Sequence, residues 1–403
     1  MILRSSSKGY TLDTHRIRPP EETLVWAKDA TAGAGITRVA DITGLDRVGI
    51  PVFTSIRPAA ASGAVTVYTG KGYTPQEAEV SAIMEGIERF SAEPRNDKLV
   101  VASYSELKKD RNVLNPVRLI LPAMRAYYYK EQIEWVTGYS ITSDMEVLVP
   151  AEAAFHPYRR ENQLFRTNTN GLAVGNVLEE AVVHGLMEVI ERDAWSLFEA
   201  LKIKGMELNL SLDKLEDFPL AKDLVKRMEA AKLKVYAKDI TSDNKIPTVA
   251  VAIDDEQTKD PALLSLGVGT HLLPELATVR ALTEAAQSRL TTIHGTREDT
   301  FKAEFARRIG YERMKRLNRK WFMPSMEFTE LKKMQAFESQ DFLDDLKHTI
   351  ESLKRTGLEE VIAVDLTRQG VGVPAVRIIV PGLEVYALDK DRAGDRLRGF
   401  RPS

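Results

Sequence analysis

Three stretches of the sequence repeat one spacing of an alanine and two oxygen-bearing side chains. A glutamate follows the alanine after seven residues, and a second carboxylate or its amide comes three residues later. Residues three apart share one face of a helix, so each copy would direct both side chains toward one point. Three such helices in one fold could build a site for a metal ion and phosphate. The copies are Ala78, Glu85 and Glu88; Ala181, Glu188 and Glu191; and Ala277, Glu284 and Gln287.

The carboxylates of the first two copies would need a cation if they lie inside the fold. Glu180 joins Glu188 and Glu191 within roughly an 80° sector of its helix, and Glu77 joins Glu85 and Glu88 in the same way. Buried like charges are costly unless they are neutralised, and Mg²⁺ bridged to phosphate neutralises them with oxygen ligands. Basic residues nearby could then meet phosphate oxygens. These are Lys8, Arg16, Lys71, Arg89, Arg192 and Arg289.

A simpler interpretation is a solvated helix face with local salt bridges, which is what a single Glu-x-x-Glu-Arg usually means. Here each copy follows a glycine-containing segment, and apolar residues such as Val80, Ile83 and Ile87 separate the acids. Other motifs are weaker. No Gly-x-x-x-x-Gly-Lys-Ser/Thr loop is present, and the histidines lack ligand spacing, so His184 and His271 are expected to pack or donate hydrogen bonds.

The composition excludes several classes of chemistry. With 403 residues, 43% of them hydrophobic, the chain can bury a large core in closely packed subdomains. It has no cysteine, which excludes disulfides, thiolate metal sites and cysteine nucleophiles. The net charge of −2 gives no reason to expect nucleic-acid binding. No stretch approaches the roughly 20 apolar residues of a membrane span, so we expect a soluble, cytoplasmic protein.

The predicted elements alternate in an α/β pattern, with α and β segments mixed. The first copy reads as a strand at 64–68, a glycine turn at 69–72 and a helix capped by Thr74 and Glu77. The second follows a polar loop at 167–175, and the third follows a glycine loop at 265–271. Further strands are expected at 234–239, 248–253, 361–366 and 375–380, with a hairpin at 135–149.

Together these blocks resemble the three signature blocks of the YcaO family. They comprise Gly70-Lys71-Gly72 with 77–89, Asn170 to Asn176 with 188–193, and Glu284-Ala-Ala-Gln287-Ser-Arg289, in the family order. The resemblance spans about 64–385. It implies a YcaO-type fold with mixed sheets and a nucleotide site built from several helices. It also implies an enzyme that uses ATP and Mg²⁺ to phosphorylate a peptide backbone amide oxygen, so that a nucleophile can replace that oxygen.

The resemblance also implies roles for individual residues. Residues 1–63 are expected to form an N-terminal segment integrated into the ATP-binding fold, and 64–403 the YcaO domain, with a charge-rich helical excursion at 297–354. Catalytic positions are Glu191, Arg192 and Gln287. The metal-binding positions are Glu85, Glu88, Glu180, Glu188 and Glu191. The nucleotide-binding positions are Lys8, Arg16, Ser81, Asn176, Arg192, Glu284 and Gln287.

The nucleophile is inferred by comparison within the family. Azoline-forming members commonly end in Pro-x-Pro-x-Pro, whereas this sequence ends in Arg-Pro402-Ser403 and shows no evident fused peptide-recognition domain. It therefore resembles the archaeal stand-alone members that form a thioglycine in the methyl-coenzyme M reductase alpha subunit, often with a TfuA-like partner and a sulfide donor. An azoline-forming cyclodehydratase and an inactive nucleotide-binding scaffold stay open as alternatives, as does a homodimer.

Glu191→Gln tests the metal-ligand assignment. We expect it to abolish ATP turnover and to leave the fold intact, because it removes a charge while keeping the shape of the side chain. Turnover measured with and without peptide checks this, and unchanged turnover would refute the assignment.

Overall fold

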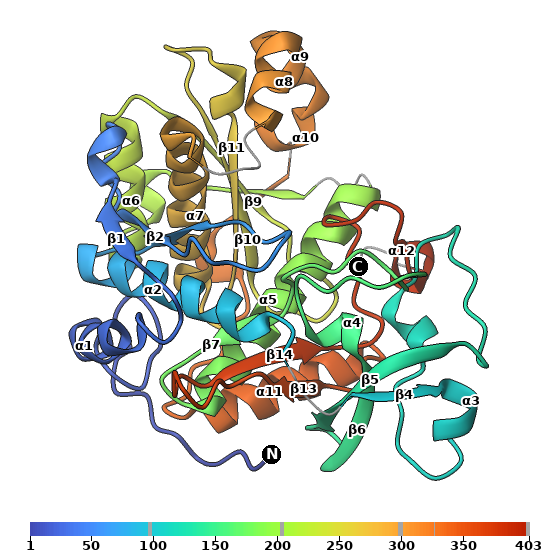
Figure 1. Cartoon of the computed structure of the whole chain (residues 1–403). Coiled ribbons are helices and arrows are strands. Elements are labelled where there is room, and N and C mark those ends of the chain that lie inside the picture. Colours follow the sequence, from blue (N-terminus) through green and yellow to red (C-terminus); the bar gives the residue numbers. More distant parts are fainter. Residues whose placement is uncertain (96–98, 202–204, 297–300, 326, 400–403) are drawn as a thin grey trace.

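The described strands form three β-sheets, and each sheet carries one of the three repeat helices (Figure 1). The computed structural model describes residues 1–95, 99–201, 205–296, 301–325 and 327–399, without the side chains of 301 and 399. The expected mixed α/β fold is confirmed. In these ranges no helix is both long and apolar enough to cross a membrane.

The first sheet is antiparallel, in the order β1-β2-β3. Helix α2 lies on this sheet and α1 packs against α2. The capping box predicted for α2 is present, because Thr74 Oγ1 accepts from Glu77 N and Glu77 Oε2 accepts from Thr74 N. The bounds are α1 Pro20–Ala30, β1 Arg38–Asp41, β2 Val52–Ile56, β3 Val67–Lys71 and α2 Pro75–Ala92.

The second sheet has the order β11-β10-β9-β8-β12, antiparallel except for the β8–β12 pair. Helix α7 covers β10 and β11, and α6 packs beside α7. The bounds are β8 Met206–Leu208, α6 Pro219–Ala230, β9 Lys234–Asp239, β10 Thr248–Asp254, β11 Ser265–Thr270, α7 Pro274–His294 and β12 Phe328–Thr329.

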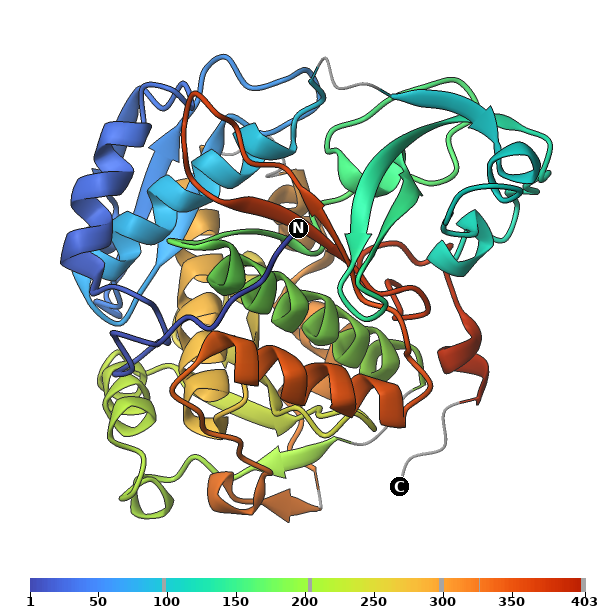
Figure 2. The same ribbon diagram turned by 90° about the horizontal axis from the view of Figure 1, so that it is seen from below.

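The third sheet has the order β4-β5-β13-β14-β7, with β6 also paired to β5. Helix α5 lies on β14 and β7, and α11 runs beside α5 (Figure 2). The bounds are β4 Val100–Ser103, β5 Gln132–Ser140, β6 Met145–Pro150, β7 Leu172–Val174, α5 Leu178–Leu201, α11 Phe342–Arg355, β13 Ile362–Asp365 and β14 Ala375–Ile379.

Short helices complete the described chain. Helices α8 to α10 gather at the top of Figure 1 and contact the 3₁₀ turn Pro261–Leu263 and the second sheet. With α11 and β12 they make up most of the predicted excursion, whose residues 297–300 and 326 lie outside the described residues. The bounds are α3 Tyr104–Leu107, α4 Ala151–Ala154, α8 Phe301–Ile309, α9 Tyr311–Leu317, α10 Arg319–Phe322 and α12 Asp395–Gly399.

The alanine of each repeat packs directly on a glycine of the preceding strand segment. A Cβ built on Gly70 would lie 2.5 Å from the Ala78 oxygen, and one on Gly269 2.2 Å from the Ala277 oxygen. A Cβ on Gly175 would likewise lie 2.7 Å from the Ala181 nitrogen. All three alanines are fully buried. Real Cβ atoms do not approach backbone this closely, so the pairs let each helix lie against its strand.

This packing corrects two predictions. The turn expected at 69–72 is largely strand, because β3 continues to Lys71, and the loop expected at 265–271 is β11. The glycines had suggested turns. In both places they instead make room for a helix, and both strands remain paired in their sheets.

The N-terminal segment is joined to α2 through three oxygen-bearing side chains. The Tyr10 hydroxyl lies 2.6 Å from Asp13 Oδ1 and 3.2 Å from Glu77 Oε1. A single phenolic proton can be donated to only one of the two carboxylates. Burial raises the pKa of Glu77 to about 8, and the neighbouring Asp13 adds to this shift. The group therefore holds an extra proton at neutral pH.

We expect Gly269→Ala to destabilise the protein by at least about 1–3 kcal/mol, because overpacking forces strand and helix apart. Urea unfolding measures the loss. Gly44→Ala is the matched control, since a Cβ there meets nothing within 4 Å. Equal unfolding midpoints for the two variants would contradict the packing role.

Glu77→Gln should make stability less sensitive to pH. The pKa of Glu77 is about 8 in the folded protein and 4.5 ordinarily, so between these values the unfolded chain loses this proton first. The free energy of unfolding therefore falls as pH rises through this window. The glutamine amide does not titrate in this range. The melting temperature of the variant relative to that of wild type should therefore rise from pH 5 to pH 8. A constant difference between the two proteins would count against the shared proton.

Candidate functional site

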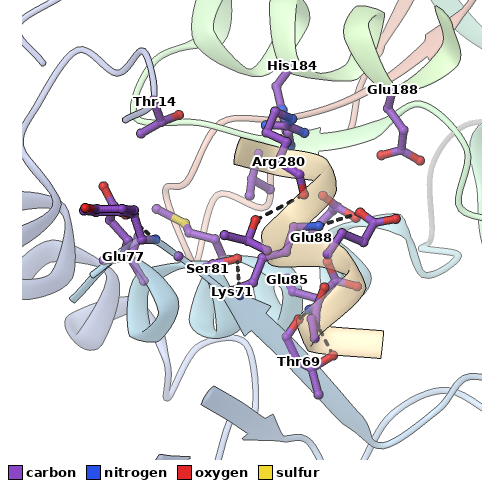
Figure 3. A pocket seen from close by; sticks show the side chains of 18 of the residues that line it. Thr14, Thr69, Lys71, Glu77, Ser81, Glu85, Glu88, His184, Glu188 and Arg280 are labelled. Atoms are coloured by element: carbon purple, nitrogen blue, oxygen red, sulfur yellow. Dashed lines mark hydrogen bonds and ion pairs between the residues drawn. The ribbon is translucent and has the colours of Figure 1, made fainter. Parts of the chain in front are cut away.

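A cavity of about 600 Å³ lies between α2, α5 and α7 (Figure 3). Each repeat helix turns its charged face into this cavity, so the oxygen-bearing side chains of the three copies lie around one space. The N-terminal segment adds Asp13, Thr14, Arg16 and Arg18, and the start of α8 adds Lys302. The predicted site residues that line the cavity are Arg16, Ser81, Glu85, Glu88, Asn176, Glu180, Glu188, Glu191, Arg192, Glu284 and Gln287.

The α2 wall carries two carboxylates joined by one arginine. Arg89 Nη2 lies 2.5 Å from Glu85 Oε1, and Arg89 Nη1 lies 3.4 Å from Glu88 Oε1. Burial raises the pKa of Glu88 well above its ordinary value although Arg89 opposes this, and Glu85 and Glu188 add to the rise. Ser81, one turn earlier on α2, accepts a hydrogen bond from the Lys71 nitrogen at 3.3 Å. A cation in the cavity would therefore favour the charged form of Glu88.

The α5 wall has the same character. Glu191 accepts a hydrogen bond from the Thr270 nitrogen at 3.1 Å, and its Oε1 lies 3.6 Å from Arg192 Nη2. Burial raises the pKa of Glu191 to about 7, with Glu284 and Glu188 contributing against the pull of Arg192. Burial also raises the pKa of Glu188. A positive charge in the cavity would relieve both carboxylates.

Glu180 lies at the start of α5 and already has partners within the chain. Its carboxylate accepts from the Ile17 nitrogen at 3.0 Å and from Asn176 Nδ2 at 3.2 Å, and Arg16 Nε lies 3.7 Å away. Asn176 Oδ1 in turn accepts from the Thr23 hydroxyl. Glu180 thus ties the N-terminal segment to α5.

The α7 wall connects the second sheet to the first. Lys71 of β3 pairs with Glu284, and Gln287 donates to the Thr69 oxygen and, at 3.1 Å, to the Thr69 hydroxyl. Although burial opposes it, the charges of Lys71 and Arg192 lower the pKa of Glu284. The amide at the second position of this copy therefore hydrogen-bonds to a strand where the other copies have an acid.

Sequence reasoning missed Arg280, which lines the cavity beside His184 in Figure 3. Its Nε is buried without a hydrogen-bond partner, and burial lowers its pKa. Arg280 precedes Glu284 by four residues, so it lies on the same helix face, and that spacing was the available signal. His184 is neutral, because burial and the nearby arginine lower its pKa well below the ordinary value.

Two basic residues expected near phosphate lie elsewhere. The Lys8 ammonium group is 2.7 Å from Asp345 Oδ2 at the start of α11, and Lys8 does not line the cavity. Its backbone holds it there, because Lys8 N donates to the Gln340 oxygen. Arg289 is 2% exposed and pairs with Asp46 and Asp255 on the far side of α7. Its position five residues after Glu284 turns it away from the cavity.

The side chains around the cavity are of the types that bind Mg²⁺ and phosphate. Carboxylate oxygens are the ligands that Mg²⁺ prefers, and a cation would offset the burial that raises the pKa values of Glu88, Glu188 and Glu191. Among the described residues, no three histidine or acidic side chains converge closely enough to hold a metal ion by themselves. The acids face one cavity from separate walls, and arginines lie beside several of them.

Comparisons with known proteins identify the family. Residues 69–384 match the model of YcaO cyclodehydratase, described as ATP- and Mg²⁺-binding. A protein of Methanothermobacter thermautotrophicus is 50% identical over 94% of this chain and 97% of its own. A protein from the tfuA 3′ region of Rhizobium leguminosarum bv. trifolii is 32% identical over 95% of this chain and 92% of its own.

A solved structure agrees with these matches. The structure of YcaO from Methanopyrus kandleri bound with AMPPCP and Mg²⁺ shares 30% identity, with a TM-score of 0.80 over 96% of this chain and 98% of that one. The chain therefore belongs to the YcaO family of ATP- and Mg²⁺-dependent peptide-modifying enzymes.

Proposed function

We propose that this protein uses ATP to phosphorylate a backbone amide oxygen of a protein substrate and that sulfide then replaces this oxygen, giving a thioamide. The observation that carries the proposal is the mixed charge of the cavity. Carboxylates with raised pKa values line the cavity together with Lys71, Arg89, Arg192 and Arg280. A magnesium-bound triphosphate, which has both positive and negative groups, suits such a lining.

Every predicted residue except Lys8, which lies outside the cavity, has a place in this proposal. Glu85, Glu88, Glu188 and Glu191 would hold Mg²⁺, with Glu180 supporting them from the start of α5. Mg²⁺ held there would supply the positive charge that neutralises the phosphates of the nucleotide. The nucleotide would contact Arg16, Ser81, Asn176, Arg192, Glu284 and Gln287.

The residues of this chain would act by position and charge. The nucleophile adds to the amide carbon, and the oxygen that becomes negative takes the γ-phosphoryl group. ADP is released in this transfer. Phosphate then leaves with that oxygen while the sulfur loses its proton, so the amide C=O becomes a C=S group. Arg192 and Arg280 would stabilise the transferring group, and Gln287, hydrogen-bonded to Thr69, would hold α7 to β3. No side chain becomes covalently modified.

Three observations support sulfide as the nucleophile. The chain has no cysteine to supply sulfur itself. A relative comes from a tfuA region, which favours a TfuA-like partner, and another comes from a methanogen. We therefore propose a glycine of the methyl-coenzyme M reductase alpha subunit as the substrate.

The family description favours a second candidate, because it names a cyclodehydratase. Azoline formation would use the same phosphorylation, with a Cys, Ser or Thr side chain of the substrate as nucleophile. An inactive scaffold is disfavoured, since all the predicted metal-binding glutamates are present and line one cavity.

Mass spectrometry separates these candidates. Incubation with peptide, sulfide and Mg-ATP, with and without the partner protein, should exchange one oxygen of the peptide for sulfur. Loss of one water would indicate azoline formation instead. Glu191→Gln is the control and should give no product. Unmodified peptide both with and without the partner protein would refute the thioamide proposal.

A further inference from the structure

A second, smaller cavity lies behind the wall of the first. Its volume is about 60 Å³, enough for an ion or a few waters, since one water needs on the order of 10–15 Å³. It is bounded by the end of β14, the turn that follows β14 and the loop before β7. Its polar lining consists of Arg118, Asn168, Asn170, Arg377 and Arg392.

Two of these arginines are buried without an acidic partner. Arg377 is 5% exposed and Arg392 is 4% exposed, and neither has a carboxylate within ion-pair distance among the described residues. Arg377 donates to the Asn168 backbone oxygen and to its Oδ1, and Arg392 donates to the backbone oxygens of Ile120 and Leu119. All of these acceptors are neutral. A buried cation that lacks a counterion is unstable relative to one that has it.

Burial lowers the pKa of both arginines to about 10, and the charges of Arg89 and Arg392 add to the shift of Arg377. Glu188 and Glu88 oppose the shift of Arg377 from the larger cavity, and the charge of Asp389 opposes that of Arg392. The guanidinium of Arg392 lies 4.2 Å from the Phe165 ring centre, which holds it in place. An anion between the arginines would relieve their repulsion.

The cavity also offers an acceptor. Asn170 Oδ1 is buried and has no hydrogen-bond partner among the described residues. Guanidinium donors and an unused amide oxygen together match an anion that carries a proton of its own, as hydrogen phosphate and hydrosulfide do.

One loop separates the two cavities. Thr169 lines the larger cavity, while Asn168 and Asn170 line the smaller one. On α5, Glu188 faces the larger cavity and the next residue, Val189, borders the smaller. We propose that the smaller cavity binds a small protonated inorganic anion. The identity of this anion rests on the proposed function: it would be either orthophosphate, a product of that reaction, or hydrosulfide, a reactant.

Calorimetric titration of orthophosphate tests the site. The full chain is first saturated with AMPPCP and Mg²⁺, so that the larger cavity is filled. We expect one phosphate per chain, and Arg392→Gln should weaken its binding by roughly tenfold or more, as for loss of a charged donor from a buried site. Arg307→Gln is the control, because Arg307 is a surface residue paired with Asp260. Hydrosulfide added last distinguishes the sources, since displaced phosphate indicates that the site takes either anion and retained phosphate indicates an oxyanion site.

No saturable phosphate binding by wild type would overturn the proposal, as would equal affinity in a folded Arg392→Gln variant. If that variant does not fold, Asn170→Ala replaces it, since it removes the amide that carries the acceptor and leaves both arginines in place, and unchanged affinity there would likewise overturn the proposal. Failure of AMPPCP to bind would count against the proposed function alone, because the variants can also be compared without the nucleotide.

Discussion

The architecture depends on the contact between the glycine of a strand segment and the alanine of the helix that follows it. Gly70, Gly175 and Gly269 each leave no room for a Cβ, and the alanines they meet are fully buried. The contact fixes how far each helix stands from its strand, and therefore where the residues seven and ten positions later point. In each repeat the alanine thus sets the packing of the helix, and the oxygen-bearing side chains that follow it face the cavity.

Charge balance is the second constraint, and it differs between the three helices. On α2 and α5 an arginine beside each acidic pair compensates part of the negative charge, and burial raises the pKa values of Glu88, Glu188 and Glu191. On α7 the acid is matched by Lys71 and the second position is an uncharged amide. The buried carboxylates with raised pKa values therefore lie on α2 and α5, and a cation near them would favour their charged forms.

Much of the site could be predicted from the sequence because helix spacing is local information. The repeat spacing alone indicated which faces carry the acids, and the capping box at Thr74 and Glu77 indicated where α2 begins. Arg289 and Lys8 could not be placed this way. Their positions depend on Asp46, Asp255 and Asp345, which are distant in the sequence. The glycines were interpreted as turns because close helix packing and tight turns use the same residue, and only the tertiary contact tells them apart.

Arg280 shows a related limit. It is a pocket residue because its helix face is the one that Glu284 defines, yet no repeat marks it. The smaller cavity could not be predicted from the sequence. Its two buried arginines come from β14 and from the segment after β14, and they follow no spacing rule.

The bonds from Lys71 to Glu284 and from Thr69 to Gln287 join residues that are 213 and 218 positions apart. Closing so long a loop carries an entropic cost, and the contacts require both partners to be present. A nascent chain that ends before Glu284 therefore cannot close this wall of the cavity. A bound nucleotide should protect all three sheets together from local opening.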